Sequence, residues 1–109
     1  MKRIINKITY NTETALPICH IEQEEYSSDF RYERSTLYRT RKGRYFLAGH
    51  GGAMSRWSKR LGENTWGGGE GIHALTRDEA LDLAEKWADD DAIDAMEEIF
   101  LPELTAAQP

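Results

Sequence analysis

The fold of this chain is decided by a segment near its centre: Leu37-Tyr38-Arg39-Thr40-Arg41-Lys42-Gly43-Arg44-Tyr45-Phe46-Leu47-Ala48-Gly49. Two runs that favour β-structure flank Lys42-Gly43, and the glycine can adopt the positive φ that a tight hairpin turn requires. A two-residue loop pairs Arg41 with Arg44, Thr40 with Tyr45, Arg39 with Phe46, and Tyr38 with Leu47. The segment therefore predicts a central antiparallel hairpin over about residues 36–49.

This register gives the hairpin two different faces, because neighbouring residues of a strand point to opposite sides. The apolar face suits a core and carries Tyr38, Tyr45 and Leu47. The basic face carries Arg39, Arg41, Arg44 and Phe46. We expect the apolar face to be buried in a small sheet.

Shorter elements surround the hairpin. Ile4–Tyr10 and Ile18–Glu22 are rich in residues typical of strands, and residues 72–75 predict a last short strand. Between the hairpin and that strand, three apolar residues recur at a spacing of four: Ala53, Trp57 and Leu61. With Gly62 directly after them, they predict a short helix over about residues 53–61.

Two helices are predicted near the C-terminus. Thr76 and Glu79 have the spacing of a capping box, and apolar residues follow on one helical stripe: Ala80, Leu81, Ala84, Trp87 and Ala88. Asp89-Asp90-Asp91 interrupts this stripe, and aspartate favours caps over helix interiors. We therefore predict helices over about residues 77–88 and 91–100, followed by a frayed tail from about residue 103.

Together these elements predict one α+β domain over residues 1–109, which fits the length of the chain. The single Cys19 excludes an internal disulfide and is consistent with a reducing compartment. No apolar run approaches the roughly 20 residues that span a bilayer, and no signal peptide is recognised. We expect a soluble cytoplasmic protein with no membrane partner.

The charges are sorted along the chain. Residues 31–60 carry nine Arg or Lys against one acid, residues 61–109 carry thirteen acids against two bases, and the whole chain has a net charge of −5. Such asymmetry often marks surfaces that meet charged partners.

The basic face of the hairpin has three interpretations. Arginines interleaved with aromatic residues on a sheet can hold phosphates and stack bases, which predicts nucleic-acid binding. The same arginines can neutralise the acidic helices of the protein itself or face water. They can also bind an acidic protein.

The acidic helices have two interpretations. Carboxylates spaced along a rigid helical face imitate phosphates, and such a face would bind a basic protein surface. The alternative is an ordinary solvated helix face. The candidate binding residues are Asp82, Glu85, Asp89, Asp90, Asp91, Asp94, Glu97 and Glu98.

The remaining polar residues do not form a recognisable catalytic or metal motif. Cys19 and the three histidines lack the spacing of metal ligands, and the glycine segments at 49–52 and 67–69 lack the P-loop pattern. We therefore expect no catalytic residue, no metal and no cofactor, hence no enzyme. Trp66, beside three glycines, is a candidate binding anchor.

Three segments carry a resemblance to known proteins: Leu37–Leu47, Gly49–Ser55 and Leu75–Ala80. Over roughly residues 8–100 the chain resembles small bacterial proteins of phages, plasmids and integrative elements, most of which have no assigned function. Small acidic proteins of such elements include anti-CRISPR and other anti-defence inhibitors, to which this chain is similar in size and composition.

The resemblance and the charges together imply a non-enzymatic protein of a phage or mobile element. In this interpretation it inhibits a host defence complex stoichiometrically, as an anti-CRISPR does, by presenting its acidic helices to a basic surface. The partner is then a host protein or ribonucleoprotein complex. The alternative is a small nucleic-acid-binding accessory protein that uses the Arg/aromatic face of the hairpin.

Overall fold

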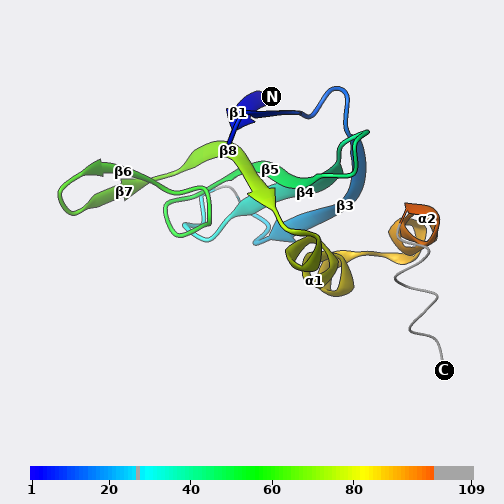
Figure 1. Cartoon of the computed structure of the whole chain (residues 1–109). Coiled ribbons are helices and arrows are strands. Elements are labelled where there is room, and N and C mark those ends of the chain that lie inside the picture. The colour runs from blue at the N-terminus through cyan, green and yellow to red at the C-terminus, as the bar shows by residue number, and fades with distance from the viewer. Residues whose placement is uncertain (27, 100–109) are drawn as a thin grey trace.

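The computed structural model describes residues 1–26 and 28–99, with side chains up to Asp94 (Figure 1). Most of the regular secondary structure is antiparallel sheet, and two helices follow it, an α+β architecture. The strands are β1 (Lys2–Ile5), β2 (Ile8–Asn11), β3 (Leu16–Gln23), β4 (Glu33–Arg39), β5 (Tyr45–Gly51), β6 (Lys59–Gly62), β7 (Thr65–Gly67) and β8 (Gly69–Leu75). The helices are α1 (Arg77–Trp87) and α2 (Asp90–Ile99).

The centre of the fold is a four-stranded antiparallel sheet in the order β3-β4-β5-β8. Two separate two-stranded ribbons complete the strands, β1-β2 and β6-β7. Figure 1 shows α1 below the sheet, β1 above it, and the ribbon β6-β7 projecting beyond one end. The sheet is therefore covered by different elements on its two faces.

The central hairpin forms as predicted, but its predicted register is wrong by one residue. Tyr45 pairs with Arg39 and Leu47 pairs with Leu37. The loop is longer than two residues, because Thr40 donates its N–H to the carbonyl of Arg44 at 2.8 Å and Gly43 lies at φ 86°. A glycine with positive φ at the end of a three-residue loop is typical of a turn with a G1 bulge.

A shift of one residue moves side chains to the other face of the sheet. Leu47 and Tyr45 are buried together on the helix side, as predicted, but Tyr38 lies on the opposite side beside Phe46. Phe46 is fully buried there, so the predicted basic face with an available Phe46 does not form.

The two faces of the sheet have separate cores. On the helix side, Leu37 and Leu47 contact a cluster that includes Ala80 and Ala84 of α1. On the other side, Phe46 lies in a cluster with Tyr10 of β2, and their rings meet edge-on with centroids 5.4 Å apart. The ribbon β1-β2 thus shields part of the face that α1 does not reach.

The predicted strand over Ile4–Tyr10 is instead a hairpin. Ile5 pairs with Ile8, and the two residues between them, Asn6 and Lys7, have φ values of 51° and 68°. Two consecutive residues with positive φ are the mark of a type I′ turn. The β-prone residues from Ile4 to Tyr10 predicted one continuous strand, whereas the chain reverses direction at Asn6-Lys7.

The predicted helix over residues 53–61 is also wrong, since turns and β6 occupy this segment. Trp57 is buried, and its indole Nε1–H donates to Ser35 Oγ at 2.7 Å, whereas Leu61 is 69% exposed. Gly71 packs beside the indole, and a Cβ there would lie 3.4 Å from the Trp57 ring, an ordinary contact distance. The burial of Trp57 in the folded protein therefore outweighs the helical spacing of Ala53, Trp57 and Leu61 in the sequence.

The helix α1 begins with the predicted capping box. Thr76 Oγ1 accepts the N–H of Glu79 at 3.1 Å, and the carboxylate of Glu79 accepts the N–H of Thr76 at 2.9 Å. After the break at residues 88–89, Asp89 Oδ1 accepts the N–H of Ala92 at 2.8 Å in the first turn of α2. Phe100 and the predicted frayed tail lie outside the described residues.

Candidate binding surfaces

Four cationic side chains line one depression between the β1-β2 turn and the β4-β5 turn. We call it the basic cleft and define it by Lys7, Arg41, Lys42 and Arg44. All four residues are exposed, and the cavity has a volume of about 540 Å³. Its other lining residues are uncharged, among them Asn11, Thr14 and Thr40, so no carboxylate lies in the lining. The cleft favours an anion.

The structure distributes the predicted basic residues of the hairpin over different places. Arg41 and Arg44 belong to the basic cleft. Arg39 points to the helix side with Tyr45, and its Nε is buried without a hydrogen-bond partner. Phe46 is in the opposite core, so its ring cannot stack on a base. Sequence reasoning missed Lys7, because Asn6-Lys7 lacks the glycine that usually marks a two-residue hairpin loop.

A row of carboxylates runs along the outer side of α1 to the start of α2. We call it the acidic stripe and define it by Asp78, Asp82, Glu85 and Asp89. Spacings of three and four residues place Asp78, Asp82 and Glu85 on one side of α1, Asp89 follows in the break between the helices, and all four residues are exposed. Within the described part of the chain there are three ion pairs, Arg31–Glu24, Arg31–Asp29 and Arg56–Glu33, and none involves the stripe.

The remaining predicted acidic residues lie on α2. Asp90, Asp91 and Asp94 are exposed. Glu97 and Glu98 fall in the backbone range of α2, but their side chains lie outside the described residues. The sheet core contacts Ala80, Ala84 and Ala92 of these helices, whereas Asp89 and Asp91 line a small cavity with Ile18 and Cys19 at the edge of that core.

Strand alternation separates Cys19 from its neighbour His20. Cys19 is buried on the helix side, where burial and then the negative charge of Asp89 raise the pKa of its thiol to about 11. A thiol with so high a pKa stays protonated near neutral pH and is a poor nucleophile. Among the described residues no group of three or more His, Cys, Asp or Glu side chains has the geometry to hold a metal ion.

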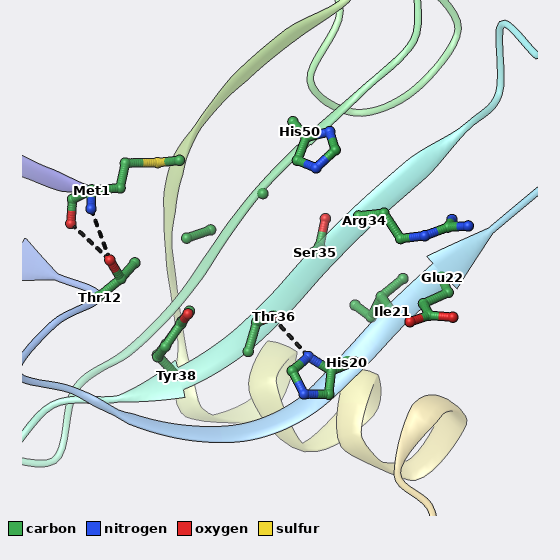
Figure 2. Close-up of a pocket in the computed structure, with 12 residues that line it drawn as sticks. Met1, Thr12, His20, Ile21, Glu22, Arg34, Ser35, Thr36, Tyr38 and His50 are labelled. Atoms are coloured by element: carbon green, nitrogen blue, oxygen red, sulfur yellow. Dashed lines mark hydrogen bonds between the residues drawn. The ribbon is translucent and has the colours of Figure 1, made fainter. Parts of the chain in front are cut away.

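A polar groove lies on the sheet face opposite the helices, beside the ribbon β1-β2 (Figure 2). His20 shares a hydrogen bond of 2.9 Å with Thr36, and Arg34 donates to the backbone carbonyls of Gln23 and Glu24 at 3.2 and 2.9 Å. Arg34 also lies over the ring of Tyr32 at 4.4 Å. These contacts commit the guanidinium of Arg34 to fixing the loop after β3, so the groove is polar but its arginine has a structural role.

The two glycine segments meet at the end of the sheet near the ribbon β6-β7. A Cβ on Gly68 would lie 2.6 Å from the carbonyl oxygen of Gly51, and one on Gly52 would lie 2.6 Å from that of Phe30. These glycines are needed because backbones approach closely there, which is a structural role. They line a cavity of about 500 Å³ together with Trp66, which is 56% exposed.

A buried polar network joins this end of the sheet to its core. Ser35 Oγ accepts the Trp57 indole N–H and donates to Glu33 Oε2 at 2.6 Å, and Arg56 Nε pairs with the same carboxylate oxygen at 2.9 Å. The pKa of nearby His73 is lowered by burial and then by the positive charges of Arg56 and Arg3. Sequence reasoning had no signal for this network, because its members come from separate segments.

Comparisons with known proteins identified no relative: no family model matches this chain, and neither a curated protein nor a solved structure does. In the described part of the chain, neither helix has the length and apolar character that crossing a membrane requires.

Proposed function

We propose that this protein is a non-enzymatic, anti-CRISPR-like inhibitor that binds a host protein or ribonucleoprotein complex stoichiometrically. Its acidic stripe, extended by Asp90, Asp91 and Asp94, would occupy a basic surface of that complex. The observation that supports this most is the spatial separation of charge: the stripe lies on the outer helices, the basic cleft lies at the hairpin turns, and no described ion pair joins them.

The stripe has the geometry of a phosphate mimic. On α1 the carboxylates of Asp78, Asp82 and Glu85 follow one another about one helical turn apart, roughly 5.4 Å along the axis. Like charges at these spacings each destabilise a helix by roughly 0.2–0.5 kcal/mol, so the row is not favoured by folding alone. A row of fixed negative charge accelerates encounter with a Lys- and Arg-lined channel and rejects acidic competitors.

The helix that carries the stripe is held in place on its other side. Ala80 and Ala84 are fully or almost fully buried against the sheet, and the Thr76 capping box fixes the start of α1. Burial of one side and charge on the other make the stripe a rigid surface, which binds with less loss of conformational entropy than a mobile one.

The test is a titration of purified CRISPR effector complexes that cleave target DNA. We expect the protein to inhibit one of them near equimolar ratio. The triple variant Asp82→Lys, Glu85→Lys, Asp94→Lys should inhibit at least about tenfold more weakly, because it reverses the charge of the binding surface. It spares Asp89, whose carboxylate caps α2.

A matched control separates the stripe from net charge. The variant Glu22→Lys, Glu63→Lys, Glu70→Lys reverses three exposed carboxylates outside the helices and changes the net charge equally. It should inhibit like the wild type, and circular dichroism should show both variants folded. Equal inhibition by both variants, or no inhibition of any effector, would contradict the proposal.

A further inference from the structure

We propose that the basic cleft is a phosphate-binding site that engages a phosphate-rich anion, such as the backbone of a nucleic acid, without reading its bases. The site lies outside the acidic stripe and does not depend on the function proposed above. Four exposed cations of two different hairpin turns line it, and no carboxylate does.

The first wall of the cleft is a rigid turn. Gly43 donates its N–H to the carbonyl of Thr40 at 3.0 Å, and the N–H of Arg44 donates to Thr40 Oγ1 at 3.0 Å. With the 2.8 Å bond from Thr40 to Arg44, three hydrogen bonds fix a loop of three residues. The backbone that carries Arg41, Lys42 and Arg44 is therefore preorganised, although their like charges repel one another.

The second wall contains a strained lysine. Lys7 occupies the second position of the β1-β2 turn at φ 68°, where glycine is strongly preferred because a Cβ is disfavoured in the left-handed region. The side chain at this position lines the cleft. A residue that is unfavourable for folding but completes a cluster of charge indicates a functional role for that charge.

The chemistry of the lining defines the class of ligand. Arginine binds phosphate oxygens with two parallel hydrogen bonds, and lysine adds a mobile point charge. No aromatic side chain lines the cleft, so it offers phosphate contacts without the stacking platform that reading or holding bases requires. Its volume is in the range of small-ligand pockets, which leaves space for more than one phosphate group.

The test measures binding of two probes at low salt: a 20-nucleotide single-stranded DNA of mixed sequence, and inorganic tripolyphosphate. The variant Arg41→Ser, Arg44→Ser should weaken binding by about tenfold or more. If both arginines contact phosphates, the slope of log affinity against log salt for DNA should also fall by about 1.4, because each contact contributes about 0.7. A merely structural role would leave that slope unchanged.

The variant Lys7→Gly makes the test sharper, because stability and binding should move in opposite directions. Removing the strained side chain should raise the melting temperature by several degrees, while removing the charge should weaken binding by roughly threefold. Loss of binding through unfolding is then excluded. A Lys7→Gly protein that binds as well as the wild type would remove Lys7 from the site.

A charge-matched control is available at the other end of the molecule. The variant Lys59→Ser, Arg60→Ser removes two exposed cations of β6. It should keep wild-type affinity, and equal loss in this variant and in the arginine variant would overturn the proposal. Binding of DNA alone assigns an extended backbone as ligand, and binding of tripolyphosphate assigns a small anion. Binding of neither probe refutes the site.

Discussion

The acidic stripe and the basic cleft are built in opposite ways. The stripe belongs to a single outer helical layer, and its helix α1 is anchored by buried alanines and a capping box. The cleft belongs to two hairpin turns that lie more than 30 residues apart in the chain, and it includes a lysine in the left-handed region. A helix therefore supplies a charged row with little backbone strain, whereas joining two turns into one site requires strain and long-range packing.

This difference has an energetic consequence. Charge changes at Asp82 and Glu85 of the stripe should alter binding with little effect on the free energy of unfolding, because surface charges away from special features contribute little to stability. Changes at Lys7 in the cleft should alter both binding and the free energy of unfolding, because this residue bears backbone strain. The following variants test how the stripe depends on the core and the cap that hold α1, and how the cleft depends on the strained turn at Lys7.

The largest effect is expected in the core that supports α1 and its stripe. Leu47→Ala should destabilise the protein by about 2–4 kcal/mol, because Leu47 is fully buried on the helix side of the sheet and truncation leaves a cavity. Urea denaturation measures this, with Leu61→Ala as the control. Leu61 is exposed on β6 and should cost less than about 0.5 kcal/mol. Similar losses in both variants would show that the assigned core is wrong.

The cap of α1 should have a smaller effect. Thr76→Ala should destabilise by about 1 kcal/mol, since it leaves the N–H of Glu79 without its side-chain acceptor. Thr76→Ser keeps the hydroxyl and should be close to the wild type in the same urea titration. If the alanine variant is equally stable, the capping box does not hold the stripe.

Relief of strain at the cleft should act with the opposite sign. Lys7→Gly should stabilise the protein by about 1 kcal/mol, because a side chain at φ 68° is unfavourable by roughly this amount. The melting temperature should rise by roughly 4 °C. Lys7→Ala removes the same charge but keeps the Cβ, so it should not gain this stability. Equal gains in both variants would point to charge repulsion rather than strain.

The smallest expected effect concerns how strongly the negative charge of Asp89 influences the buried thiol of Cys19. Because the pKa of Cys19 is about 11, only about 1% of its thiol is ionised at pH 9, where a free thiol would be about half ionised. Alkylation by iodoacetamide should therefore be slow in the folded protein. Asp89→Asn removes a charge that raises this pKa, so alkylation should become faster by up to about threefold.

The asparagine can still accept the N–H of Ala92, so this variant should leave the start of α2 intact. Fast alkylation of the wild type at pH 9 would contradict the burial of Cys19. No change in Asp89→Asn would mean that solvent screens the end of the stripe.

The amino-acid sequence by itself determined the local features of this protein. The capping box at Thr76, the break at the aspartates and the charges along α1 follow from spacings of three and four residues, because helical geometry relates only near neighbours. The central hairpin also followed from a glycine between two β-prone runs. The sign of each charged surface could be read from composition.

Only the tertiary structure decided which charges share a site. The longer loop at Gly43 shifted the register by one residue and buried Phe46, and a positive φ at Lys7 folded a predicted strand into a hairpin beside the basic turn. Trp57 is not part of a helix but is buried, with its indole N–H bonded to Ser35. These outcomes depend on contacts between segments distant in the chain, which no local periodicity encodes, and so the acidic stripe was visible in the sequence while the basic cleft was not.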